Sequence, residues 1–439
     1  MKQKLTIAEK LAKRNYKTPS NLAWFGYKLL SNLPFFAPKY RVTYKIIDDI
    51  REEKGPCFIV WNHLSRRDYL FIKKIIAPKK FNMVAGYSEF FRRKFYGLFK
   101  YSQILPKKNF TNDPIGVRAI NKIIKSGGCV SFSPEGMSSI YGHNQPVVPG
   151  TGRFLQFYKV PVYFVKLEGA YLTSHKTDIK DRIGKVTATI SKLFTPEDLT
   201  SMTTTEIEDK LNLTFKHDDY EWNKTARVKY KIRNRAAYNL ETICYKCPKC
   251  GKDLVMVGEG NKLYCKECGN GCTINDYYDF IPFNKECIIP ESLTKWVEFE
   301  RKDLIQEIRK DKDYSFEFKC EIGDLPEYKL MTKNKSSIKC GNGKFKIDHN
   351  GIHFVGTRHD KEYKFDLSYE AYYTILIEEA TDIFSLFVNG EYIVFYPEDV
   401  RCVGKSLLLV EEMHRYHVNT WKNFPWNNHL YKGTELEKK

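Results

Sequence analysis

Residues 57–68, CFIVWNHLSRRD, join a short apolar run to a polar turn that holds a histidine and an aspartate. An apolar run of this length bounded by a turn is typical of a buried strand. In open α/β folds, ligands and reacting groups gather where the strands of the sheet end. The stretch therefore predicts a strand that ends at Trp61 and a site that begins at Asn62.

The chain on both sides of this stretch repeats its pattern. Between residues 46 and 200, short apolar runs alternate with segments of helical periodicity. The predicted strands are residues 57–61, 82–85, 103–105, 129–132 and 162–167, and the predicted helices include residues 68–76, 88–101 and 114–125. Such alternation predicts an α/β layer domain. We assign this domain residues 46–243, which include a charge-rich helical extension from residue 201.

His63 and Asp68 form a pair that can move a proton. A neutral imidazole takes a hydroxyl proton well near pH 7. A carboxylate can fix the tautomer of that imidazole and stabilise the imidazolium that forms. Residues 65–68 also have the form of a capping box, so the residues alone leave open that Asp68 only caps a helix.

A second and a third motif follow the next predicted strands. The run CVSF at residues 129–132 leads into SPEGMSS at residues 133–139, and VPV at residues 160–162 opens the following strand. Gly136 can supply a backbone conformation that other residues avoid. Glu135 and the hydroxyl groups after it suit the glycerol or phosphate part of a substrate. Each motif alone fits a turn, but their order and spacing together are specific.

Together the three motifs resemble the 1-acylglycerol-3-phosphate O-acyltransferase (lysophospholipid acyltransferase) family over about residues 45–200. The NHxxxxD, FPEGTRS and VPV blocks of that family correspond to residues 62–68, 133–136 and 160–162. The resemblance implies an acyltransferase that moves a fatty acyl group directly, without an acyl-enzyme. The implied donor is acyl-CoA or acyl-carrier protein, and the implied acceptor is lysophosphatidic acid or a related lysophospholipid.

The resemblance also assigns roles to residues. It implies that His63 is the general base and that Asp68 orients it. The residues implied to bind substrate are Asn62, Lys107, Lys108, Glu135, Gly136 and Ser138. Lys107 or Lys108 stands where the family usually has an arginine that binds phosphate. A lysine can supply the positive charge of that arginine, but not its planar, bidentate hydrogen bonding.

Two further departures concern the second motif. Ser133 stands where the family has phenylalanine, and Met137-Ser138 stands where it has Thr-Arg. These differences leave the acceptor open between lysophosphatidic acid and another lipid that bears a hydroxyl group.

Positive charge is concentrated at the start of the chain. The protein has 439 residues and a formal charge of +19, and residues 1–110 hold 24 Lys or Arg against 7 Asp or Glu. A basic region suits anionic lipid, nucleic acid or another acidic partner, or simply a solvated surface. Residues 1–45 are expected to form basic helices with an apolar face, either at a lipid interface or packed on the domain. That face contains Trp24, Phe25, Tyr27, Leu29, Leu30, Leu33, Phe35 and Phe36, among Lys28, Lys39 and Arg41.

Residues 90–100, FFRRKFYGLFK, combine aromatic and basic side chains in the same way. They fit either a membrane-facing helix or a core stripe, and we expect the membrane role. The expected membrane residues here are Phe91, Arg92, Arg93, Lys94, Phe95 and Phe99. No apolar run approaches the roughly 20 residues of a transmembrane helix, and residues 1–15 lack the apolar core of a signal peptide. The sequence therefore predicts peripheral binding to anionic lipid on the cytoplasmic face of a membrane.

A cysteine module occupies residues 244–275. Two Cys-x-x-Cys-Gly knuckles, with the thiols of Cys247, Cys250, Cys265 and Cys268, flank a predicted hairpin. Four thiolates at this spacing suit tetrahedral zinc, and closed sites of this kind are structural. We therefore predict a zinc ribbon without a catalytic role. Cys244 and Cys272 lie nearby and are expected to be unliganded.

The last third of the chain becomes β-rich. Asn389-Gly390 between FSLFV and EYIVFY fits a type I′ hairpin turn. Helices are expected near residues 290–310 and 398–416. Several β runs closed by one helix resemble a pleckstrin-homology or GRAM-like domain in topology. We therefore predict a helix and a β-rich domain in residues 276–439.

Two other functions fit part of this evidence. A zinc ribbon, basic charge and aromatic residues are compatible with a nucleic-acid-binding protein. The charge lies with the acyltransferase motifs, however, and the region around the ribbon is mixed in sign, so nucleic acid is not expected as a partner. A catalytically degenerate membrane tether is the other alternative. The presence of His63, Asp68 and Glu135 argues against it.

Overall fold

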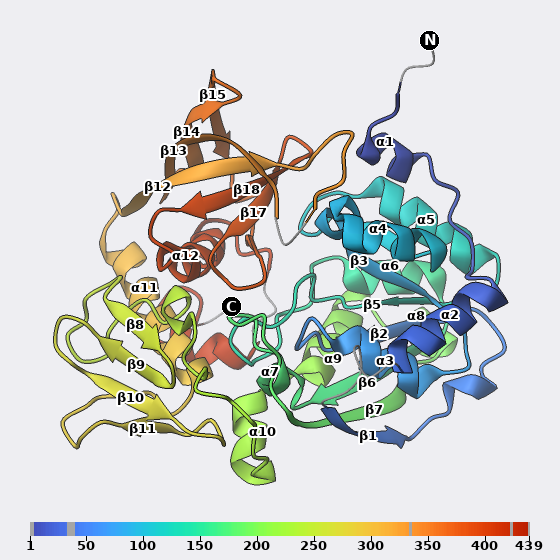
Figure 1. Ribbon diagram of the computed structural model, residues 1–439, viewed down its shortest axis with the longest axis horizontal. Helices are drawn as coiled ribbons and strands as arrows, with labels where there is room; N and C mark the ends of the chain where they lie inside the picture. Colours follow the sequence, from blue (N-terminus) through green and yellow to red (C-terminus); the bar gives the residue numbers. More distant parts are fainter. Residues whose placement is uncertain (1–3, 33–39, 333–335, 422–424, 438–439) are drawn as a thin grey trace.

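The computed structural model describes residues 4–32, 40–332, 336–421 and 425–437. Three sheets with their helices make up this part of the protein (Figure 1). Leu33, Phe35, Phe36 and Lys39, which were expected on the apolar N-terminal segment, lie outside the described residues.

The first sheet has seven strands in the order β1-β7-β6-β2-β5-β3-β4. Neighbouring strands are parallel except for the antiparallel pair β6 and β7. Their bounds are β1 Tyr40–Ile46, β2 Phe58–Trp61, β3 Asn82–Gly86, β4 Leu105–Lys107, β5 Val130–Phe132, β6 Val162–Glu168 and β7 Gly184–Phe194. The carboxyl ends of the five strands from β6 to β4 therefore meet at one edge of the sheet.

Helices cover both faces of this sheet, because its strands are apolar on both sides. On β2, Ile59 and Trp61 pack into the same core as Phe71 of α3, whereas Phe58 and Val60 pack into a second core with helix α5. A strand that is buried on both faces has a continuous apolar sequence, such as CFIVW. The helices of this region are α1 Ile7–Ala12, α2 Asn21–Asn32, α3 Asp68–Ile76, α4 Arg93–Tyr101, α5 Pro114–Lys125, α6 Thr151–Tyr158, α7 Ala170–Thr173, α8 Pro196–Ser201, α9 Thr204–Phe215 and α10 Asp219–Ala226.

The expected α/β elements agree closely with the structure. The predicted helices 68–76 and 114–125 have the observed bounds of α3 and α5. The segment 88–101 is divided into a 3-10 helix, Tyr87–Phe91, and α4. Residues 40–45 were expected to be helical and this expectation was wrong, because the sequence YRVTYKI forms the edge strand β1 against β7. Its β-branched and aromatic residues suit a strand.

The cysteine module forms a small four-stranded antiparallel sheet in the order β11-β10-β9-β8. Its strands are β8 Met256–Glu259, β9 Lys262–Cys265, β10 Gly271–Ile274 and β11 Phe280–Pro282. The expected hairpin is β8 and β9. The 18-residue helix α11, Leu293–Lys310, follows and buries Leu293, Trp296 and Val297.

The C-terminal sheet has seven antiparallel strands in the order β15-β14-β13-β12-β18-β17-β16, and helix α12, Cys402–His417, follows it. The strands are β12 Ser315–Asp324, β13 Ile338–Asp348, β14 Gly351–Arg358, β15 Lys361–Leu367, β16 Leu376–Ile377, β17 Phe384–Val388 and β18 Glu391–Pro397. Asn389 and Gly390 have φ values of 51° and 83°, as a type I′ turn requires. The region is β-rich and ends in a helix, and its resemblance to a pleckstrin-homology or GRAM-like domain stays a prediction.

Candidate active site at the carboxyl edge of the first sheet

The His63 ring lies directly after β2 and contacts a buried carboxylate. Its Nδ1 is 2.9 Å from Oδ2 of Asp68, whose side chain is 1% exposed. A carboxylate only accepts hydrogen bonds, so Nδ1 carries the proton and Nε2 keeps a free lone pair. The His63 side chain is 27% exposed, which leaves Nε2 open to a substrate.

Asp68 is the first residue of α3, and its carboxylate holds the turn as well as the histidine. The Ser65 hydroxyl donates to Oδ1 at 2.7 Å, and the Ser65 N–H lies 3.1 Å from both carboxylate oxygens. Burial raises the pKa of Asp68, and the hydrogen bonds from His63 and Ser65 act in the opposite direction. Holding the Ser65 turn and contacting the histidine are therefore two functions of one side chain, and the N-cap of α3 is Arg67, without a side-chain cap.

Glu135, in the second motif, is completely buried behind His63. Its Oε1 accepts the backbone N–H of His63 at 2.8 Å, and its Oε2 accepts the backbone N–H of Gln145 at 2.7 Å. The Ser139 N–H in turn donates to the His63 carbonyl at 2.6 Å. Burial raises the pKa of Glu135 well above its usual range, against these backbone N–H groups. The side chain thus fixes the backbone that carries the histidine and does not reach open space.

Asn62 holds the other side of the same turn. Its Nδ2 donates to the Leu167 carbonyl at 2.8 Å, and its Oδ1 accepts the Leu167 N–H at 2.7 Å. The side chain is fully buried, so both ends of its amide link the end of β2 to the end of β6. The expected direct contact of Asn62 and of Glu135 with substrate was therefore wrong, because both side chains are buried and form hydrogen bonds with the backbone of the protein.

Gly136 lies where another part of the chain comes close. Its φ is +78°, and a Cβ atom there would lie 2.7 Å from the Phe110 ring. The Asn109 side chain donates to the Gly136 carbonyl at 2.5 Å. The structure thus brings the residues after β4 against the second motif, as expected for strands whose carboxyl ends share an edge.

Lys107 and Lys108 follow β4 and are both engaged. Lys107 Nζ lies 3.8 Å from Asp113 Oδ2, and burial lowers the pKa of Lys107. Lys108 Nζ donates to the Gly390 carbonyl at 3.1 Å and lies over the rings of Tyr87 and Phe387. Lys108 therefore contacts the turn between β17 and β18 of the C-terminal sheet.

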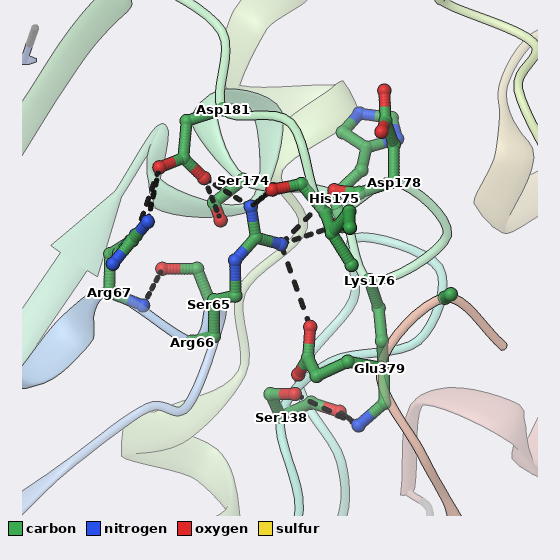
Figure 2. A network of polar contacts seen from close by, with 12 residues as sticks. Ser65, Arg66, Arg67, Ser138, Ser174, His175, Lys176, Asp178, Asp181 and Glu379 are labelled. Carbon is green, nitrogen blue, oxygen red and sulfur yellow. Dashed lines mark hydrogen bonds and ion pairs between the residues drawn. The ribbon is translucent and has the colours of Figure 1, made fainter. Parts of the chain in front are cut away.

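A cluster of polar side chains after β6 also reaches this edge, and the motifs gave no sign of it (Figure 2). Lys176 Nζ donates to the Ser138 hydroxyl at 2.9 Å, and Arg66 lies between Asp181 on one side and Glu379 on the other. The one available signal was a polar run, TSHKTDIKD at residues 173–181, which comes shortly after the predicted strand 162–167. Glu379 is 203 residues from Lys176 in the numbering, and nothing local connects it to the site.

The two expected membrane segments are partly buried. Trp24 is 9% exposed and packs edge-on against Phe81, and Phe91 is 3% exposed in a core with Ile7 and Leu11. The expected membrane contact was therefore wrong for Trp24 and Phe91, because both side chains belong to the core.

Other side chains of these segments do face outward. Phe25 is 63% exposed, Arg93 and Lys94 are exposed, and Phe95 and Phe99 are half-buried against each other. Arg92 is half-buried and lies 3.4 Å from Glu89. None of the described helices is long and apolar enough to cross a membrane.

The four expected zinc ligands converge at the tips of the ribbon. The sulfur atoms of Cys247, Cys250, Cys265 and Cys268 all lie within 4.8 Å of one another. The Cys247–Cys268 and Cys250–Cys265 separations are 3.7 and 3.9 Å. Zinc with four thiolates at about 2.3 Å in a tetrahedron requires sulfur atoms about 3.8 Å apart, so the group fits a metal ion of this kind. Gly251 and Gly269 have φ values near 70°, as the knuckles need.

Comparisons with known proteins give little additional information. No protein-family model matches the chain, and no curated protein matches it. Among solved structures, the chain is similar to the 1-acyl-sn-glycerophosphate (LPA) acyltransferase PlsC from Thermotoga maritima. The identity is 18% and the TM-score is 0.36, over 44% of this chain and 77% of that chain. A likeness at this level assigns no activity to the protein.

Proposed function

We propose that the protein is an acyltransferase that moves a fatty acyl group from acyl-CoA or acyl-carrier protein to a hydroxyl group of a lysophospholipid. The observation that carries this proposal is the His63–Asp68 pair, 2.9 Å apart, with the imidazole exposed at the carboxyl edge of the sheet. This is the arrangement that general-base activation of a hydroxyl requires. The order of the three motifs supports a lipid hydroxyl as the acceptor.

In the proposed reaction, Nε2 of His63 takes the proton of the acceptor hydroxyl as its oxygen attacks the thioester carbonyl. A C–O bond forms, and the C–S bond then breaks. The departing thiolate receives the proton from the imidazolium, so the histidine returns to its neutral form. Asp68 stabilises the imidazolium in between. Glu135 and Asn62 act indirectly, because their hydrogen bonds fix the backbone on both sides of His63.

Mass spectrometry of reactions with a panel of lysolipids tests this function. Each acceptor is offered with acyl-CoA and with acyl-carrier protein as donor, to the wild type and to His63→Ala. We expect a diacyl product from the wild type that is lost in the variant. Absence of any new ester with every pair of substrates, or equal yield from the variant, would contradict the proposal.

We further propose that the protein binds a membrane surface through α2 and α4. Leu22, Phe25 and Leu29 recur along one side of α2 and are 57–70% exposed. A Cβ on Gly26 of the same helix would lie 3.6 Å from the Tyr101 ring, and Tyr101 is itself 47% exposed. Exposed apolar side chains in a row, next to basic residues, suit the lipid interface.

We propose that the cysteine group holds one structural zinc ion. Cys247 and Cys265 are buried, and the module packs in the same core as α11. When bound, zinc would supply four metal–thiolate links that stabilise the ribbon. Nothing about the group suits a role in acyl transfer, since all four positions of a tetrahedron are filled by thiolates.

A further inference from the structure

Lys176 is a buried ammonium group at the edge of the candidate active site. Its residue is 5% exposed, and its Nζ lies 2.9 Å from the hydroxyl and 3.4 Å from the carbonyl of Ser138. Both partners are neutral, and no ion pair within the described residues includes Lys176. Burying a cation without an anion in contact is costly. A lysine in this position therefore needs a reason beyond packing.

Ser138 ties this lysine to the reacting group. It belongs to the second motif, and the N–H of the next residue, Ser139, donates to the carbonyl of His63 at 2.6 Å. The ammonium is thus linked, through Ser138 and Ser139, to the backbone that carries the proposed general base. It stands on the loop after β6 and reaches the hydroxyl of Ser138, in a motif that has no cation of its own.

A second cation, Arg66, lies beside Glu379, as the side chain of Lys176 does (Figure 2). Its guanidinium donates to the carbonyls of His175 and Asp178 at 3.2 and 3.1 Å and pairs with Asp181. Its Nη1 also lies 3.5 Å from Oε2 of Glu379, a longer contact than the others. Arg66 is therefore held rigidly, with its weakest bond directed at Glu379.

The carboxylate of Glu379 comes from the C-terminal sheet. It lies on the segment 378–381 between β16 and β17, and its side chain is 36% exposed. The next residue, Ala380, donates its N–H to the Lys176 carbonyl at 2.8 Å. The Glu379 carboxylate thus reaches Arg66 through one long contact, on a segment that water reaches.

We propose that Lys176 and Arg66 form a subsite for a phosphate group of a bound substrate, and that this phosphate displaces the carboxylate of Glu379. A phosphate offers several charged acceptor oxygens and can bond an ammonium and a guanidinium together. The inference rests on the proposed function and adds to it the group that recognises the substrate.

Two sources of phosphate are possible, the acceptor headgroup and the CoA part of the donor, and kinetics with matched substrates distinguishes them. Lys176→Met is tested with lysophosphatidic acid and with monoacylglycerol as acceptors, and with acyl-CoA and an acyl thioester of N-acetylcysteamine as donors. A charged hydrogen bond is worth about 10- to 100-fold in binding. We expect KM to rise by about this factor only for the phosphate-bearing member of one pair, while Lys176→Arg keeps most of the affinity.

Glu379→Gln removes the competing carboxylate and should lower KM for the same phosphate-bearing substrate several-fold. Lys180→Met, an exposed lysine of the same loop, and Glu370→Gln, an exposed glutamate of the C-terminal sheet, are the matched controls. Binding of short-chain lysophosphatidic acid and of CoA to each variant is also measured, each ligand by itself, so the subsite is tested even if no acyl transfer occurs. Equal effects of Lys176→Met on phosphate-bearing and phosphate-free substrates, or unchanged binding of both ligands, would overturn the subsite.

Discussion

At the scale of single residues, the candidate site depends on the His63–Asp68 hydrogen bond and on several others that fix the turn and the backbone around it. The His63–Asp68 contact was predictable, because both residues lie in one short motif and only a turn separates them. The cations Lys176 and Arg66 were not, because their meeting depends on a loop more than a hundred residues further along the chain. Sequence spacing indicates local partners and says little about distant ones.

His63→Ala should lower acyl transfer by about 10²- to 10⁴-fold, because the hydroxyl loses its base. Thermal unfolding should change little, since the imidazole is partly exposed. A matched control is His353→Ala in the C-terminal sheet, where the ring contacts Asp366 and Asp348 in a similar way. Turnover of both variants is measured with the best acceptor. If the two histidines prove equally dispensable, His63 has no catalytic role.

Gly136→Ala should destabilise the protein and reduce its activity. The position has a positive φ, and the new Cβ would press on the Phe110 ring at 2.7 Å. Strain of this kind costs about 1–3 kcal/mol. Denaturant unfolding measures the loss, and adding Phe110→Leu should recover the steric part only. A double variant no more stable than Gly136→Ala alone would show that backbone strain accounts for the whole effect.

At the scale of elements, continuous apolar runs and amphipathic helices were predicted well, and edge elements were not. The bounds of α3 and α5 follow from apolar spacing and, for α5, from Asp113 and Pro114 at its start. Strand β1 and the antiparallel strand β7 were missed. Both alternate apolar and polar residues, as YRVTYKI does, so a strand was indicated locally, but the strands with which they pair were not.

Vesicle flotation tests the membrane role of α2. Replacing Phe25 and Leu29 by Ser should reduce binding to all vesicles, because both side chains are more than half exposed. Replacing Arg93 and Lys94 by Gln should weaken binding to anionic vesicles alone, by about 1 kcal/mol per charge, and less at high salt.

Phe157→Ser on α6 is the control. This phenylalanine is 73% exposed, like those of α2, but it belongs to a different helix. Binding that falls as much in this variant as in the α2 variant would mean that α2 is no special membrane contact.

Elemental analysis should find one zinc ion per chain in protein purified without a metal-binding tag. Cys265→Ser should abolish it and lower the unfolding temperature, because a structural site contributes its binding energy to folding. Cys287→Ser is the matched control, as this cysteine lies outside the four-sulfur group. Zinc retained by Cys265→Ser, or metal-free wild-type protein of full stability, would rule out the site.

At the scale of the whole molecule, the regions share one core. A single apolar cluster extends from Trp24 through Val165 and Cys265 to Met413. The sequence predicted the regions separately, and it could not show that they pack together, since no pattern in one region indicates its contacts with another. We therefore expect heat to unfold the protein in one transition. Scanning calorimetry measures this.

Arg301 is the buried charge on which this packing depends most. It lies on α11 and bonds Glu412 and Glu411 of α12 at 2.5 and 2.6 Å, with all three side chains about 1% exposed. Arg301→Met removes the cation between two buried carboxylates, leaves Glu412 with the longer 3.4 Å contact to Arg415, and should cost about 3–5 kcal/mol. Arg309→Met, whose partner Glu435 is half exposed, should cost far less. Urea unfolding compares the two, and equal losses would contradict the assignment.

The contact between Ala380 and Lys176 joins positions that leave the ribosome at different times. Roughly 200 residues separate them, and synthesis at roughly 5–20 residues per second puts about 10–40 s between their appearances. During this interval the α/β region with His63, Asp68 and Lys176 has been made, but the C-terminal sheet that contacts Lys176 has not. A nascent chain is thus open to water and to chaperones at an edge that the finished protein partly covers, and synthesis of the C-terminal sheet, rather than folding of the first domain, marks when this edge is complete.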